Sequence, residues 1–141
     1  MGLFYYAGHG VQVGGENYFI PIGARIDLES DVPYEAVPLG KVLGAMDEAG
    51  NPVNIVLIDA CRNNPYSRGW RSSTRGLAFV QSAKGMLTSF ATGPGKEAQD
   101  GSGRNSPYTA SLLEYIQEPD LQIELMLKNV RQGVVSRPFA S

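Results

Sequence analysis

Two short apolar runs, each leading to a chemically reactive side chain, constrain this sequence more than any other feature. The first run, at residues 3–7, leads into His9, the only histidine of the chain, which lies between two glycines. The second run, at residues 54–60, ends at Cys61, the only cysteine. Continuous apolar runs of this length are typical of strands buried on both faces. We therefore predict two buried strands, each followed by a reactive residue.

The segments around these runs predict an alternation of strands and helices. Apolar residues at helical spacing predict a helix that begins at Leu39 and is stopped by Gly50-Asn51-Pro52. Further elements are expected along the chain: extended segments at 16–24 and 85–92, loops at 27–38, 62–76 and 93–107, a helix opened by Pro107 and a last helix capped by Asp120. This order predicts an α/β domain with a mostly parallel sheet flanked by helices.

The composition excludes several classes of protein. At 141 residues, the chain is long enough for one domain with a core and too short for two comfortable ones. Its formal net charge of −2 provides no basic excess for binding nucleic acid or an anionic membrane. No apolar run approaches the roughly 20 residues of a membrane span, and no secretory signal is visible. A single cysteine cannot form an internal disulfide, so we predict a reducing compartment and a cytoplasmic protein.

The two reactive residues are expected to meet at one edge of the sheet. Loops at the carboxyl ends of parallel strands share an edge, and the separation of 52 residues (61 − 9) leaves room for a crossover helix. An imidazole beside a thiol can generate the thiolate and later protonate the leaving group. Gly8 and Gly10 are expected to let the backbone adopt conformations closed to other residues and to let a substrate pass close to the chain. The N–H groups of Gly10 and Cys61 are candidate donors to an oxyanion.

The motifs that carry these residues resemble a known family. "FYYAGHG" (4–10) and "VLIDACRNNP" (56–65) are similar to the two catalytic motifs of the caspase-like cysteine peptidases of clan CD, and more to bacterial metacaspases and orthocaspases than to animal caspases. Residues 89–116 resemble the small-subunit region of bacterial members. The resemblance implies a caspase-like fold. It also implies His9 as the general acid/base, Cys61 as the nucleophile, Gly10 as an oxyanion donor and Asp59 as the acid of a specificity pocket.

Asp59 also has a reading from strand geometry. Side chains two positions apart point to the same face of a strand, so Asp59 and Cys61 are expected to open on one side of the sheet. A carboxylate there favours a substrate Arg or Lys and disfavours a substrate Asp. Pairing with Arg62 or with loop amides remains the alternative for Asp59.

The same resemblance indicates a domain layout and possible processing. We expect one domain over residues 1–141, with a histidine- and cysteine-bearing part at 1–67, an inter-subunit-like loop at 68–84 and a small-subunit-like part at 85–141. If the site accepts basic residues, the candidate self-cleavage sites are Arg68, Arg71, Arg75 and Lys84.

The chain departs from the family pattern at its start. Family domains carry about two strands before the histidine strand, and this sequence has none, which predicts a domain truncated at the N-terminus. The first strand then has an exposed edge that is expected to recruit a second copy or a partner chain.

Two functions remain open from the sequence. The first is a cysteine endopeptidase that cleaves after Arg or Lys through a Cys-His dyad and processes itself. The alternative is a non-catalytic caspase-like interaction or regulatory fragment. No cofactor or metal is expected, although the alternating carboxylates Asp27, Glu29 and Asp31 offer weak support for calcium. The predicted partners are peptide or protein substrates, with no nucleic acid and no membrane.

Overall fold

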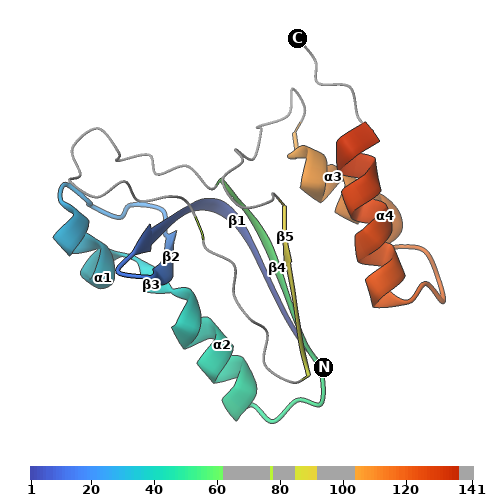
Figure 1. Ribbon diagram of the computed structural model, residues 1–141, viewed down its shortest axis with the longest axis horizontal. Helices are drawn as coiled ribbons and strands as arrows, with labels where there is room; N and C mark the ends of the chain where they lie inside the picture. The colour runs from blue at the N-terminus through green and yellow to red at the C-terminus, as the bar shows by residue number, and fades with distance from the viewer. Residues whose placement is uncertain (62–76, 78–84, 92–103, 137–141) are drawn as a thin grey trace. The chain divides into compact units, whose positions relative to one another are not determined.

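The computed structural model describes residues 1–61, 77, 85–91 and 104–136 (Figure 1). The chain divides into two compact units, Met1–Glu97 and Ala98–Ser141. The first unit contains the sheet and the two sequence motifs, and the second contains a pair of helices.

The described part of the first unit is built on a mixed sheet of five strands in the order β3-β2-β1-β4-β5. The strands are β1 (Gly2–Val13), β2 (Glu16–Ile20), β3 (Val37–Pro38), β4 (Asn54–Cys61) and β5 (Met86–Phe90). β4 runs parallel to both β1 and β5, whereas β2 is antiparallel to β1 and β3. The predicted α/β class is confirmed, and the parallel half of the sheet carries both motifs.

β1 pairs with two different strands in succession. Its first part pairs with β4 from Gly2 to His9, and its last part pairs with β2 from His9 to Val13. The turn into β2 consists of Gly14 and Gly15, with φ of 58° and 85°. Two residues at positive φ form the tight turn whose twist matches a β-hairpin, and glycine adopts that conformation without a steric penalty. This hairpin extends β1 past the end of the predicted strand.

The helix α2 (Leu39–Glu48) confirms the prediction made from its apolar spacing. Its end is joined to the start of β4 by Asn54, a buried side chain whose Nδ2 donates a hydrogen bond to the Met46 carbonyl at 3.1 Å. The Oδ1 of Asn54 accepts a hydrogen bond from Asn51 Nδ2 at 3.2 Å. A buried amide satisfied in this way fixes the helix against the sheet.

Residues 27–38, predicted to be a loop, instead contain the 3-10 helix η1 (Glu29–Asp31), the helix α1 (Val32–Glu35) and β3. The prediction overlooked local capping. An oxygen of the Asp31 carboxylate accepts hydrogen bonds from the N–H groups of Asp27 and Leu28, at 3.1 and 2.8 Å. Proline is tolerated in the first turn of a helix, where its missing N–H has no partner to lose, so Pro33 does not prevent α1.

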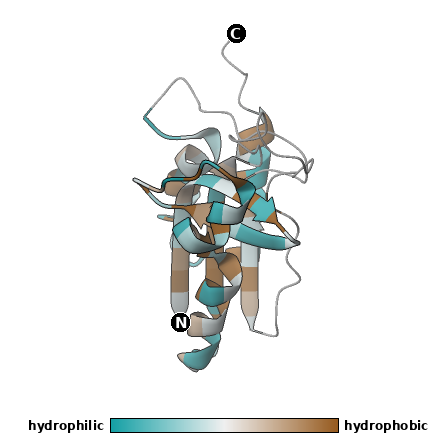
Figure 2. Ribbon diagram, turned by 90° about the vertical axis from the view of Figure 1, so that its left-hand side faces the viewer, coloured by the Kyte–Doolittle hydropathy of each residue, from teal (hydrophilic) through white to brown (hydrophobic). Residues whose placement is uncertain are grey.

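The described residues of the first unit form a larger and a smaller hydrophobic cluster. The larger one lies between the sheet and α2, and its buried members are Phe19, Leu39, Val56, Ile58, Ala60 and Leu77. The smaller one packs the β1–β2 hairpin against the η1–α1 region, with Val11, Ile26, Val32 and Ala36 buried. In Figure 2 the strands carry long hydrophobic segments, whereas α2 alternates hydrophobic and hydrophilic residues along its length, as expected for a helix with one buried face.

The prediction that both apolar runs are buried on two faces is right for β4 and wrong for β1. Residues 55–58 of β4 are all at most 6% exposed. In β1, Phe4 and Tyr6 pack toward α2, but Leu3 and Tyr5 on the other face are 58% and 42% exposed. β4 lies between two strands, whereas among the described residues the first part of β1 has only β4 beside it. An apolar run alone does not reveal this difference.

The second unit pairs α3 (Pro107–Tyr115) with α4 (Ile123–Ser136). As predicted, Pro107 opens α3, and the Oγ of Ser106 caps the helix by accepting a hydrogen bond from the Thr109 N–H at 3.0 Å. The prediction that Asp120 caps the last helix is wrong, because α4 begins three residues later and Asp120 has φ of 60°. None of the described helices has the length and apolar content needed to cross a membrane.

Candidate active site

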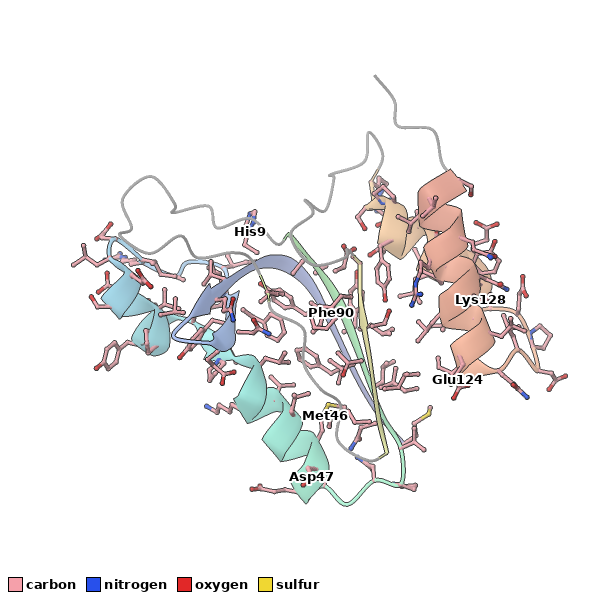
Figure 3. The ribbon with its side chains drawn as sticks, viewed as in Figure 1. His9, Met46, Asp47, Phe90, Glu124 and Lys128 are labelled. Atoms are coloured by element: carbon pink, nitrogen blue, oxygen red, sulfur yellow. The ribbon has the colours of Figure 1, made fainter. Side chains whose placement is uncertain are left out.

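The sequence predicted His9 in a loop after the first strand, but the residue lies within β1. The strand continues to Val13 because the hairpin supplies β2 as a new partner from His9 onward. The side chain of His9 is exposed, and Figure 3 shows it at the bend of β1, pointing away from α2. The imidazole is therefore accessible, although its backbone is held by two neighbouring strands.

The expected meeting of His9 and Cys61 is found in the backbone register. The two residues are Cα partners in the last pair of the parallel ladder between β1 and β4. β4 ends at Cys61, as predicted. The side chain of Cys61 lies outside the described part of the structure, so the register of the two strands, and not a sulfur–nitrogen distance, brings these positions together.

Asp59 lies on the same face of the sheet as His9. Alternate residues of β4, including Ile58 and Ala60, belong to the cluster beneath α2, which places Asp59 on the opposite face. The same alternation in β1 puts Tyr6 toward α2 and His9 away from it. Asp59 is 7% exposed and pairs in register with Ala7. A carboxylate is thus buried two positions before Cys61, while Arg62 lies outside the described residues.

The glycines that flank His9 have a packing role that the sequence did not reveal. On the α2 side of β1, protein side chains fill the space next to both glycines. A Cβ on Gly8 would lie 2.7 Å from the Tyr6 hydroxyl oxygen, and one on Gly10 would lie 2.9 Å from side-chain carbons of Leu77. The two glycines therefore allow Tyr6 and Leu77 to pack against the backbone on each side of His9.

Tyr6 is a residue at this site that the sequence reasoning missed. Its hydroxyl donates to the carbonyl of His9 at 2.8 Å and also lies 3.0 Å from the carbonyl of Ile20. Its ring packs on Phe19, with ring centroids 4.2 Å apart. Burial raises the pKa of the Tyr6 phenol above 10.0, so the hydroxyl stays protonated as a donor near neutral pH. The available signal was Gly8, two positions after Tyr6 on the same face of the strand, where the lack of a side chain leaves room for the Tyr6 ring and hydroxyl.

Two further predictions concern a metal ion and self-cleavage. Among residues 1–60, 77, 85–91 and 104–136, no group of three or more His, Cys, Asp or Glu side chains is arranged to hold a metal ion. Of the proposed calcium ligands, Asp31 uses one carboxylate oxygen to cap the turn at residues 27–28. The candidate self-cleavage residues Arg68, Arg71, Arg75 and Lys84 all lie outside the described residues.

Comparison with known proteins supplies the family. No curated protein matches the chain. The family model described as the caspase domain, peptidase C14, matches residues 1–140, almost the full length. The match covers both motifs and both compact units, and it indicates cysteine peptidase chemistry. From the paired strand positions and this match, we conclude that the chain belongs to the caspase domain family of peptidases.

Proposed function

We propose that this protein is a cysteine endopeptidase of the metacaspase type, with Cys61 as nucleophile and His9 as general acid/base, and that it cleaves peptide bonds after Arg or Lys. The observation that carries the proposal is the register pairing of His9 with Cys61 on adjacent parallel strands. Both residues are the only ones of their type in the chain, so no other cysteine or histidine competes for these roles.

The reaction needs only these two side chains and backbone N–H groups. The imidazole takes the thiol proton, and the thiolate attacks the carbonyl carbon of the scissile bond to form a tetrahedral oxyanion. The protonated imidazole then gives its proton to the leaving amine as the carbon–nitrogen bond breaks. Water, deprotonated by the same imidazole, hydrolyses the resulting thioester and regenerates the thiol.

Strand geometry supports Gly10 as an oxyanion donor, together with the N–H of Cys61. The N–H of Gly2 donates to the Val53 carbonyl at 2.9 Å, on the β4 side of β1. Because successive residues of a strand direct their N–H groups to alternate sides, the N–H of Gly10 has the same direction. The β1–β4 ladder ends one residue earlier, at His9. By the same step that joins Gly2 to the carbonyl of Val53, the N–H of Gly10 is directed toward the backbone of Cys61, so this donor lies beside the nucleophile.

Asp59 supports specificity for a basic residue. It is a buried carboxylate on the face of the sheet that carries His9, two positions before the nucleophile. A substrate guanidinium or ammonium group would bind it through charge-assisted hydrogen bonds, whereas a substrate carboxylate would be repelled. The caspase signature of animal enzymes has glutamine at this place, so the exchange to Asp59 favours the metacaspase type.

The test is covalent labelling with a peptide electrophile that carries arginine next to its warhead. We expect labelling of the wild-type chain at Cys61, no labelling of Cys61→Ala and strongly reduced labelling of His9→Ala. Asp47→Asn, which changes an exposed carboxylate on α2, serves as the matched control and is expected to label normally (Figure 3). Absence of labelling in the folded wild-type chain would instead support the non-catalytic interaction fragment.

A further inference from the structure

We propose that Tyr6 is a positioning residue that holds the backbone at His9 through its hydroxyl group, so that the imidazole faces the substrate in one conformation. This inference rests on the proposed function, because it assigns a role toward the general acid/base. The Tyr6 hydroxyl makes two short contacts with backbone carbonyls. The peptidase reaction itself does not require these contacts.

The need for such a group follows from the place of His9 in the sheet. His9 is the residue at which β1 leaves β4 and begins to pair with β2. It is flanked by Gly8 and Gly10, and Gly8 has φ of 157°, a value that residues with a side chain rarely adopt. Glycines on both sides leave the backbone freer than any other residue would. Two ladders hold His9 itself, and a further contact between these glycines helps a catalytic side chain to keep its direction.

The Tyr6 hydroxyl supplies that restraint across two strands. His9 and Ile20 are register partners in the β1–β2 ladder, and the hydroxyl oxygen lies 2.8 and 3.0 Å from their carbonyl oxygens. One proton is shared between two acceptors, so the hydroxyl fixes the spacing of the two strands beside His9. The hydrogen-bond donor comes from a side chain three residues before His9, on the face of the sheet opposite to the imidazole.

The tyrosine itself is held rigidly enough for this role. Its ring lies 4.2 Å from the ring of Phe19, which in turn lies 5.8 Å from the ring of Phe4. Phe19 is 2% exposed and belongs to the cluster beneath α2. The ring of Tyr6 is therefore anchored in the core, and its hydroxyl contacts the carbonyls of two strands. Removal of the hydroxyl alone separates the positioning role from the packing role.

The experiment compares Tyr6→Phe with Tyr18→Phe. Tyr18 is a partly buried tyrosine of the same sheet that packs against the smaller cluster, so its loss of a hydroxyl controls for general effects. Because the loss of one hydrogen bond corresponds to about a 3- to 10-fold effect, we expect Tyr6→Phe to lower kcat on an arginine peptide by that factor. KM is expected to stay unchanged, because the specificity pocket is not touched. Tyr18→Phe is expected to leave both constants at the wild-type values.

A second measurement keeps the inference testable if the chain proves inactive. His9 is the only histidine, so the imidazole gives a single set of NMR signals. In Tyr6→Phe we expect these signals to shift and to broaden or split, and the amide protons of His9 and Gly10 to exchange faster. In Tyr18→Phe they are expected to remain as in the wild type. Unchanged His9 signals in folded Tyr6→Phe, or equal changes in both variants, would overturn the inference, whereas an inactive wild type with the expected NMR changes would overturn only the proposed function.

Discussion

His9 and Cys61 are register partners in the last pair of the parallel ladder between β1 and β4. The same histidine is also the register partner of Ile20 in the antiparallel ladder between β1 and β2. Two ladders therefore fix the backbone at position 9, whereas position 61 is the last residue of its strand. In the proposed mechanism, the acid/base is held by the sheet and the nucleophile stands where the sheet ends.

Substitution of Asp59 is expected to change specificity more than catalysis. Because the carboxylate is buried, Asp59→Ala should lower kcat/KM on arginine peptides. The expected decrease corresponds to a loss of about 2–5 kcal/mol of transition-state stabilisation. Peptides with a small neutral residue at the cleaved position should lose much less. The measurement is kcat/KM on matched Arg, Lys, Ala and Asp peptides, with Asp47→Asn as the control. Equal cleavage of Arg and Asp peptides by the wild-type chain would exclude Asp59 from the pocket.

Self-processing is expected within the segment that contains Arg68, Arg71, Arg75 and Lys84. A site that accepts basic residues would cut this segment because it follows the nucleophile in the chain and is rich in them. Intact-mass spectrometry after long incubation should show new fragments from the wild type and none from Cys61→Ala. Fragments of the same mass in both samples would assign the cleavage to a contaminating peptidase, and the absence of fragments in both would rule out processing under those conditions.

Ser111 of α3 and Gly133 of α4 lie close together, so we predict that substitutions at these two positions have coupled effects on stability. Ser111 is fully buried, and its Oγ has no hydrogen-bond partner among the described residues. Ser111→Ala is therefore expected to stabilise the unit by about 1 kcal/mol. A Cβ on Gly133 would lie 2.9 Å from that Oγ, so Gly133→Ala should destabilise by about 1–3 kcal/mol.

The control for this pair is Gly44→Ala in α2, where an added Cβ meets nothing within 4 Å. That variant should gain about 1 kcal/mol from helix propensity alone. In a Ser111→Gly background the contact is removed, and Gly133→Ala should then stabilise in the same way. Urea unfolding of the single and double variants measures each value. If Gly133→Ala stabilises the chain that retains Ser111, the two helices do not approach as closely as described.

The raised pKa of Tyr6 predicts a loss of stability in alkali. The phenol is protonated in both states below 10.0, the ordinary value, so its contribution to the free energy of unfolding is complete there. Above that pH the unfolded chain loses its proton first, and the contribution falls until the pH passes the folded-state pKa. The stability difference between the wild type and Tyr6→Phe should therefore shrink as the pH rises above 10. A difference that stays constant or grows would contradict the assigned burial of the hydroxyl.

We predict that the chain associates through the edge of β1 that has no partner strand among the described residues. Among the described residues, Gly2–Gly8 pair only with β4, and Leu3 is 58% exposed. Such an edge recruits another strand, so sedimentation velocity should show a dimer or a larger assembly. Leu3→Lys is expected to shift the chain toward monomer, whereas Leu28→Lys, at a site 61% exposed outside this strand, should not. A wild-type chain that stays monomeric at high concentration would count against the prediction.

Local patterns in the sequence predicted the elements whose cause is local. The run that became β4 and the apolar spacing of α2 each depend on residues within one segment, and both were located closely. The β1–β2 hairpin was missed although Gly14-Gly15 between two extended segments is a strong hairpin signal. Its omission led to the incorrect placement of His9 in a loop.

The remaining errors arose because tertiary contacts decide the outcome. The prediction could pair positions 9 and 61 at one sheet edge, because parallel strands share that property. It could not show that the space beside Gly8 and Gly10 is filled by Tyr6 and Leu77, since these contacts depend on strand register and on a residue nearly 70 positions away (77 − 10 = 67). The exposed face of β1 was unpredictable for the same reason.

The pairing of β1 with β4 also determines when the site can form. It joins residues 52 positions apart (61 − 9), so the ladder closes a long loop of chain. The entropy lost in closing such a loop is recovered only by contacts made afterwards, so pairings of this kind form late in folding. A nascent chain that has not yet been synthesised to residue 61 contains His9 but not its register partner. In the proposed mechanism, peptidase activity is therefore expected only once the sheet is assembled, and a nascent chain before that point would not cut itself or its neighbours.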